Sequence, residues 1–79
     1  MASLDTAYRS LLATVVTWDA PGPPRWNAHT QGLKCVLARA LHDRGHLELT
    51  DRDAWVVVDR ITPRGRAFLA AGRDSGGRV

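Results

Sequence analysis

Three histidines and one cysteine are the side chains of this chain best suited to bind a metal ion. They are His29, His42, His46 and Cys35, and the spacing of seven residues between Cys35 and His42 places these two on one face of a helix. A zinc site needs converging ligands, usually from paired C-x-x-C or H-x₃-H spacings. The sequence has no C-x-x-C, and its one H-x₃-H spacing, His42 and His46, has no second pair to complete a site. We therefore predict no metal site and no cofactor.

Asp51, Asp53 and Asp59 are carboxylates that lie in or near a predicted hairpin. No recognisable pair of nucleophile and base stands beside them, as covalent or acid–base catalysis would require. Acidic residues in turns are explained by turn chemistry. The glycines of 75–77 lie in the C-terminal tail and form no phosphate-binding loop. We therefore predict no catalytic residues and no enzymatic activity.

Size and charge restrict the class of protein. A chain of 79 residues forms one domain, which we place at residues 1–72, followed by a flexible tail at 73–79. The formal charge is +3, and ten of the eleven basic residues are arginine. This abundance indicates either contacts to phosphate or the codon bias of a GC-rich genome. The single cysteine and the lack of a signal peptide or membrane span predict a cytoplasmic protein.

Two helices are expected in the first part of the chain. Residues 3–17 form an amphipathic helix, because their apolar residues repeat at helical spacing; these are Leu4, Ala7, Tyr8, Leu11, Leu12, Val15 and Val16. Residues 19–27 contain three prolines and a glycine, which predict a loop. A second helix is predicted over 28–44, with a break at Gly32 and Asn27 as a possible N-cap.

The second helix has a predicted inner and outer face. Its apolar face is assigned to Leu33, Val36, Leu37, Ala40 and Leu41. Its outward face then presents Gln31, Lys34, Cys35, Ala38, Arg39 and His42. An outward Cys35 would be able to crosslink a dimer or sense oxidation. A lone cysteine is more often a small, half-buried hydrophobe, and we favour that interpretation.

The last part of the chain is predicted as a hairpin followed by a helix. Residues 46–50 and 54–61 are the expected strands, joined by the polar residues 51–53. Thr62 is suited to cap the next helix and Pro63 to begin it. Gly72 is expected to end that helix.

The segment LARALHDRGHLELTDRDAWVVVDRITPRGRAFL, residues 37–69, resembles the second half of the winged-helix domain of MarR-like and PadR-like transcription regulators. The resemblance implies an α+β winged helix with three or four helices and a two-stranded antiparallel wing. Helix 32–44 would then read the major groove of double-stranded DNA. Such domains usually have a separate helix before this one, for which only residues 26–31 remain here.

The resemblance also assigns candidate DNA contacts. They are Gln31, Lys34, Arg39 and His42 on the reading helix, Arg52 at the tip of the wing, and Arg64 and Arg66 on the last helix. We expect a small regulator, with helices 3–17 and 63–71 available for a homodimer.

A protein-binding winged helix is the alternative, such as a phage-type inhibitor or an adaptor subunit of a larger complex. Trp18, Trp26 and Trp55 would be its anchors, because aromatic anchors often dominate the energy of an interface. Trp18 and Trp26 would otherwise clamp the proline-rich loop onto the domain.

Overall fold

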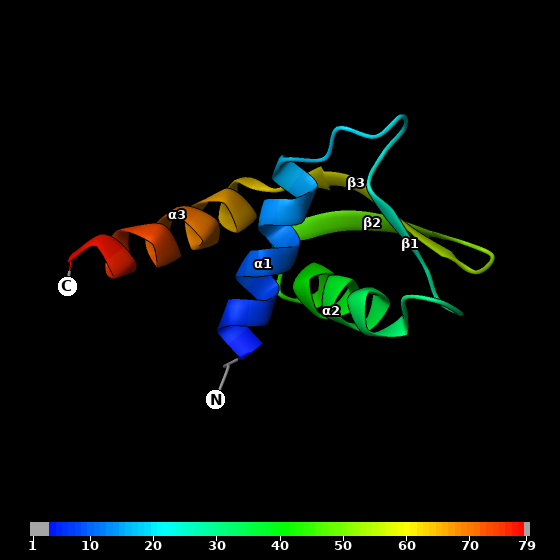
Figure 1. Ribbon diagram of the computed structural model, residues 1–79, viewed down its shortest axis with the longest axis horizontal. Coiled ribbons are helices and arrows are strands. Elements are labelled where there is room, and N and C mark those ends of the chain that lie inside the picture. Colours follow the sequence, from blue (N-terminus) through cyan, green and yellow to red (C-terminus); the bar gives the residue numbers. More distant parts are fainter. Residues whose placement is uncertain (1–3, 79) are drawn as a thin grey trace.

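The computed structural model describes the backbone of residues 4–78 and the side chains of residues 4–71. Its elements follow in the order α1 (Leu4–Val16), β1 (Arg25–Asn27), α2 (Gly32–Asp43), β2 (Leu47–Arg52), β3 (Trp55–Ile61) and α3 (Pro63–Arg78) (Figure 1). The described part therefore contains three helices and one antiparallel sheet of three strands. The predicted α+β class is confirmed, and this order is compatible with the winged helix that the resemblance implies.

β3 is the central strand of the sheet, with β1 on one side and β2 on the other. β2 and β3 form the predicted hairpin, which turns at Asp53 and Ala54. Asp53 has a φ of 54°, a conformation that two-residue hairpin turns require and that aspartate tolerates. The link between the strands is shorter than predicted, because Asp51 and Arg52 belong to β2.

β1 is a strand that the sequence does not predict, since residues 19–27 read as a loop. The prolines end at Pro24, which leaves Arg25–Asn27 free to pair with the edge of β3. The pairing places Trp26 opposite Val56, and the Pro24 carbonyl accepts a hydrogen bond from the Val58 N–H at 2.8 Å. The loop prediction is therefore wrong at its C-terminal end.

The predicted helix over 28–44 begins only at Gly32, because residues 28–30 form a turn. The Asn27 side chain accepts a hydrogen bond from the His29 N–H at 2.8 Å, and the Asn27 carbonyl accepts one from the Gln31 N–H at 2.7 Å. Asn27 thus closes this turn and does not cap α2. The resemblance implies a separate helix before α2, and a single turn takes its place in this chain.

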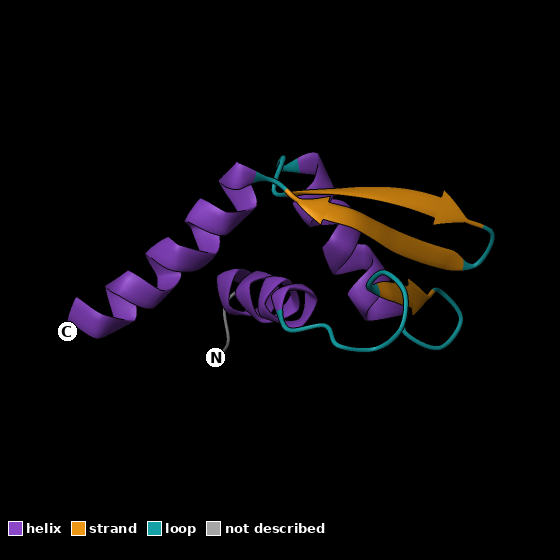
Figure 2. Ribbon diagram, turned by 90° about the horizontal axis from the view of Figure 1, so that it is seen from above, coloured by secondary structure: helices purple, strands orange, loops and turns teal. Residues whose placement is uncertain are grey.

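The hydrophobic core lies where α1 and α2 pack against the sheet. Its buried side chains are Tyr8, Leu11, Leu12, Trp26, Cys35, Ala38, Leu41, Leu47, Val56, Val58 and Ile61. The hairpin and α3 extend in opposite directions from this centre (Figure 2). The amphipathic helix predicted over 3–17 is confirmed, although Leu4 and Val16 near its ends remain exposed.

The junction between β3 and α3 has the predicted capping structure. Thr62 Oγ1 accepts a hydrogen bond from the Gly65 N–H at 3.1 Å, and the same hydroxyl donates to the Gly45 carbonyl at 2.6 Å. Pro63 is the first residue of α3, where its missing N–H costs nothing. Gly65 lies so close to the corner after α2 that a Cβ would stand 2.0 Å from the His46 carbonyl oxygen. The motif therefore fastens α3 to that corner.

α3 continues to Arg78, past Gly72, where the sequence predicts its end. The flexibility predicted for the tail at 73–79 stays a prediction. No helix of the described part has both the length and the apolar character needed to cross a membrane.

Candidate functional site

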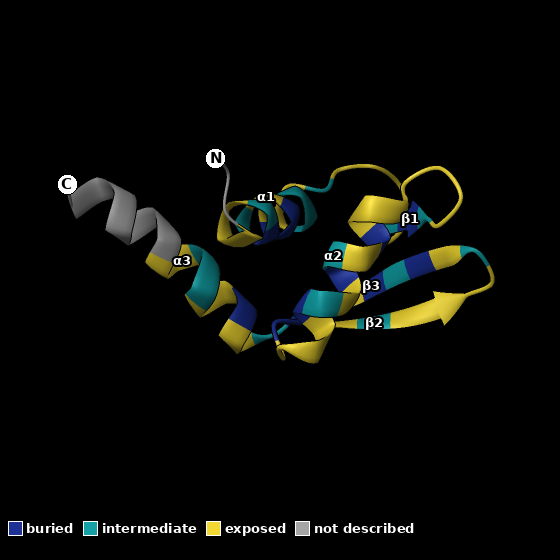
Figure 3. Cartoon of the chain, turned by 90° about the horizontal axis from the view of Figure 1, so that it is seen from below, coloured by how far each residue is buried: buried dark blue, intermediate teal, exposed yellow. Residues whose placement is uncertain are grey.

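α2 presents a different face to the solvent from the one that the sequence predicts. Cys35 and Ala38, predicted outward, are buried together with Leu41. Leu33 and Val36, predicted inward, are 73% and 62% exposed. Buried and exposed positions around α2 can be followed in Figure 3. The predicted orientation of this helix is therefore wrong at these four positions. Leu37, Ala40 and Leu41 pack in or against the core as predicted. The remaining residues predicted outward are exposed, namely Gln31, Lys34, Arg39 and His42.

Small side chains explain the observed orientation. Cys35 and Ala38 allow α2 to approach β1 closely, and the Cys35 thiol donates to the Trp26 carbonyl at 3.5 Å. Bulkier residues at these positions would hold helix and strand further apart. Burial raises the pKa of the Cys35 thiol, which keeps it protonated. Cys35 is thus confirmed as a small buried hydrophobe, and the outward reactive thiol is excluded.

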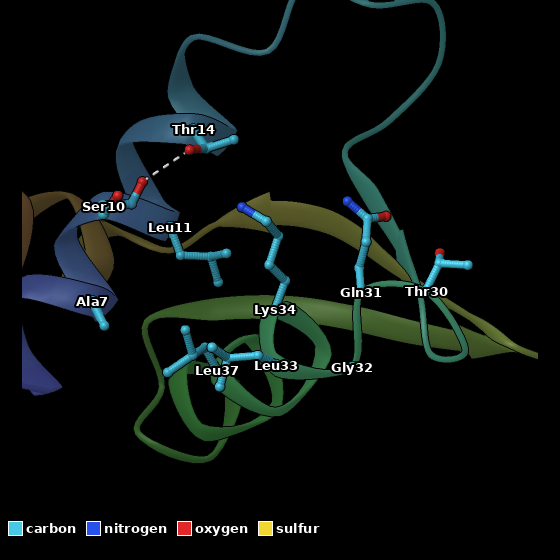
Figure 4. A pocket seen from close by; sticks show the side chains of 10 residues that line it. All are labelled: Ala7, Ser10, Leu11, Thr14, Thr30, Gln31, Gly32, Leu33, Lys34 and Leu37. Carbon is cyan, nitrogen blue, oxygen red and sulfur yellow. Dashed lines mark hydrogen bonds between the residues drawn. The ribbon is translucent and has the colours of Figure 1, made fainter.

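A groove with a volume of about 380 Å³ separates α1 from the first half of α2. It is lined by Ala7, Ser10, Leu11 and Thr14 from α1 and by Thr30, Gln31, Gly32, Leu33, Lys34 and Leu37 from the other side (Figure 4). Figure 4 shows Leu11 pointing toward Leu33 and Leu37, and Lys34 extending from α2 toward α1. Lys34 is the only charged residue in this lining. The groove therefore has an apolar floor and a polar rim with one positive charge.

Leu33 connects the groove to the outward side of α2. It lines the groove, and it lies three residues from Val36, so the two are neighbours on the helix surface. We call Leu33, Val36 and the half-buried Leu37 the α2 apolar surface, beside which the buried Leu11 of α1 lines the groove. Exposed apolar surface of this kind marks an interaction site when it is contiguous. One sequence signal could have predicted this orientation, because cysteine is often buried in folded proteins. A helix that faces the core with Cys35 turns Leu33 and Val36 toward the solvent.

Arg39 is the predicted DNA contact with the most defined partner. Its guanidinium donates to both carboxylate oxygens of Asp51 on β2, with Nη1 to Oδ2 at 2.9 Å. This hydrogen bond lowers the pKa of the Asp51 carboxyl and raises the pKa of Arg39. Arg39 thus ties α2 to the hairpin and would have to leave Asp51 to bind a base edge.

The other candidates on α2 are separated along the helix. Gln31 and Lys34 line the groove, and Gln31 Oε1 accepts a weak hydrogen bond from the Asn27 N–H at 3.4 Å. His42 lies at the opposite end of α2, where its Nδ1 is 3.7 Å from the Asp43 carboxylate. These three residues do not form one reading face.

Arg52, Arg64 and Arg66 are exposed, and none of them forms an ion pair with a described acidic side chain. Arg52 lies at the hairpin tip, whereas Arg64 and Arg66 follow the opposite end of β3 (Figure 1). A strand of seven residues separates the two positions by roughly 20 Å. The structure therefore does not gather the predicted DNA contacts on one surface.

The three tryptophans occupy different environments. Trp26 is 2% exposed and meets the half-buried Trp18 edge to face, with ring centroids 6.3 Å apart. This contact confirms that Trp18 and Trp26 clamp the proline-rich loop. Trp55 is 41% exposed and lies 5.9 Å below the Arg25 guanidinium. Of the predicted partner anchors, Trp26 is thus unavailable in the folded chain and Trp55 is the most accessible.

Phe68 on α3 is surrounded by cationic and aromatic groups that sequence reasoning did not bring together. The guanidinium carbons of Arg9 and Arg44 lie 4.7 and 5.5 Å from its ring centroid, and the His46 ring lies 4.8 Å away. These groups come from α1, from the corner after α2 and from α3, so no local pattern joins them. The contact uses part of the surface of helices 3–17 and 63–71. The homodimer predicted to form through these two helices stays a prediction.

His46 is buried, and its Nδ1 has no hydrogen-bond partner among the residues that the structure describes. Burial lowers the pKa of its imidazole, and the charges of Arg44 and Arg64 lower the pKa further. The folded chain then binds fewer protons at this site than the unfolded chain. The stabilisation that neutral His46 contributes to the folded chain is therefore complete above about pH 6.5. It is lost as the pH falls toward the pKa of His46 in the folded chain.

We expect the free energy of unfolding, measured by urea titration, to decrease between about pH 7 and about pH 5. The variant His46→Phe should show a flatter dependence, because its side chain cannot gain a proton. The variant His29→Gln, changed at an exposed position, should keep the slope of the natural chain. An equally steep decrease in His46→Phe would assign the effect to other groups.

The α2 apolar surface is the described feature that points most directly to a function. No three His, Cys, Asp or Glu side chains among the described residues are grouped closely enough to hold a metal ion. No known family model, curated protein sequence or solved structure matches this chain. The kind of partner is therefore inferred from the surface itself.

Proposed function

We propose that this chain is a protein-binding winged-helix module that docks on a partner through the α2 apolar surface. The observation that supports it is the exposure of Leu33 and Val36 on the outward side of α2. In the DNA-binding domains that the chain resembles, this helix enters the major groove, where hydrogen-bonding side chains read base edges. Apolar side chains at the centre of a contact are typical of protein interfaces. The module would act as an adaptor or inhibitor subunit of a larger complex.

DNA binding is the second candidate. It is favoured by the exposed Arg52, Arg64 and Arg66, which form no ion pair with a described acidic side chain. The net charge of +3 also favours it, because such cations give salt-dependent affinity for phosphates. It is weakened by the pairing of Arg39 with Asp51 and by Asp53 at the hairpin turn. We therefore place it below protein binding.

Two binding measurements on the full chain separate these candidates. The first uses the partner that co-purifies with the tagged chain from its source cells, purified and titrated against the natural chain, Val36→Asp and Arg66→Gln. We expect Val36→Asp to weaken binding at least about tenfold, as for loss of a central apolar contact, and Arg66→Gln to leave binding unchanged. Both positions are exposed, and circular dichroism should confirm that both variants fold.

The second measurement is fluorescence anisotropy of a random-sequence DNA duplex at low and high salt. Binding that decreases with salt, is weakened by Arg66→Gln and survives Val36→Asp would favour the DNA candidate. Together with the absence of any protein partner that depends on Val36, that result would overturn the proposed function.

A further inference from the structure

We infer that the groove between α1 and α2 receives an amphipathic helix of the partner that carries a carboxylate opposite Lys34. This inference rests on the proposed function, because it names the segment that binds to the same surface. Three observations lead to it: the size and lining of the groove, its place in the fold, and its charge.

The size and lining of the groove suit a few apolar side chains from one face of a helix. Its volume of about 380 Å³ lies at the lower end of the range for ligand pockets, so it accepts a few side chains and not an entire helix. Leu11 and Leu37 form the floor, and Leu33 continues the apolar surface outward. Two helices with such a surface between them bind a third through apolar residues at i, i+3 or i+4 and i+7.

The place of the groove in the fold indicates what is missing from it. The resemblance implies a separate helix before α2, and residues 28–30 form only a turn there. Thr30, at the end of this turn, lines the groove, so a helix in place of the turn would run beside it. Leu33, close to this turn along the chain, is 73% exposed. A helix of the partner would supply the cover from outside.

The charge of the groove determines the polar group of the partner. Lys34 is the only charged residue of the lining. The first turn of α2 contains no acidic residue, and Gln31 forms no capping hydrogen bond with its side chain, so the positive end of the helix dipole adds to the charge of Lys34. A carboxylate on the partner helix is complementary to both.

A display library of helical peptides, with two fixed leucines one turn apart and the neighbouring positions randomised, tests this inference. It is selected on the full chain and, in parallel, on Lys34→Glu. We expect Asp or Glu to be enriched at one position on the natural chain, and Lys or Arg at the same position on Lys34→Glu. An acidic peptide from the first selection should bind Lys34→Glu roughly tenfold more weakly, because attraction becomes repulsion, and should bind Arg66→Glu unchanged.

Amide chemical shifts should then place the selected peptide at Leu11, Leu33 and Leu37. The inference would be overturned if the selections gave no enrichment or gave the same sequences on both chains. It would also be overturned if the selected peptide changed the chemical shifts of amides outside the groove. Concentration-dependent shifts of the groove amides without peptide would overturn it as well, because they would identify a second copy of the chain as the occupant. If Val36→Asp weakens binding of the purified partner but Lys34→Glu does not, the inference fails and the proposed function stands. If neither variant weakens binding of the purified partner, the proposed function fails as well.

Discussion

Replacing Gly65 with alanine is expected to lower the free energy of unfolding by about 2–4 kcal/mol, the sum of an overpacking cost and a weakened helix cap. The added Cβ would stand 2.0 Å from the His46 carbonyl oxygen and 3.0 Å from Ile61 Cγ2. A backbone oxygen cannot rotate away as a side chain would, so α3 must move from the corner after α2. That movement stretches the hydrogen bonds of Thr62 to Gly45 and to residue 65 itself. Urea denaturation followed by circular dichroism measures the loss.

Gly32→Ala is the matched control for this prediction. Gly32 is the first residue of α2, and a Cβ there would meet no atom within 4 Å. Alanine should therefore be tolerated, with a gain of up to about 1 kcal/mol from its higher helix propensity. Equal losses in both variants would show that the close contact at Gly65 does not limit the position of α3.

Replacing Trp26 with alanine is expected to cost about 3–5 kcal/mol, the usual range for removal of a buried aromatic side chain. Trp26 is 2% exposed and is among the largest fully buried side chains of the described chain. Its ring packs against Trp18, and its own backbone carbonyl accepts a hydrogen bond from the Cys35 thiol. Since small domains have only about 5–15 kcal/mol of total stability, the variant should unfold at much lower urea concentrations.

Trp55→Ala provides the contrast, because Trp55 is 41% exposed and its described aromatic contact is with Arg25. We expect a loss of about 1 kcal/mol or less. A folded Trp26→Ala variant with normal stability and no partner binding would contradict the core assignment and restore Trp26 as an anchor. Comparable losses in the two variants would show that Trp55 is more deeply packed than its exposure indicates.

The sequence by itself determined those elements whose signals are local. The apolar repeat of residues 3–17 specifies α1, since one face of that helix is apolar and the rest is mostly polar. The β2–β3 hairpin and the cap at Thr62 and Pro63 follow from alternation and from helix-start chemistry. Each of these signals lies within a few neighbouring residues, so each could be interpreted without knowing the fold.

The tertiary structure alone decided the orientation of α2 and, with it, the candidate site. Apolar residues lie around most of this helix, from Leu33 to Leu41, so periodicity cannot select the buried face. The selection depends on which side chains fit between α1 and the sheet, and the small Cys35 and Ala38 fit where Leu33 and Val36 do not. Packing between distant segments therefore exposed the apolar surface, and the spacing of apolar residues along α2 does not contain that information.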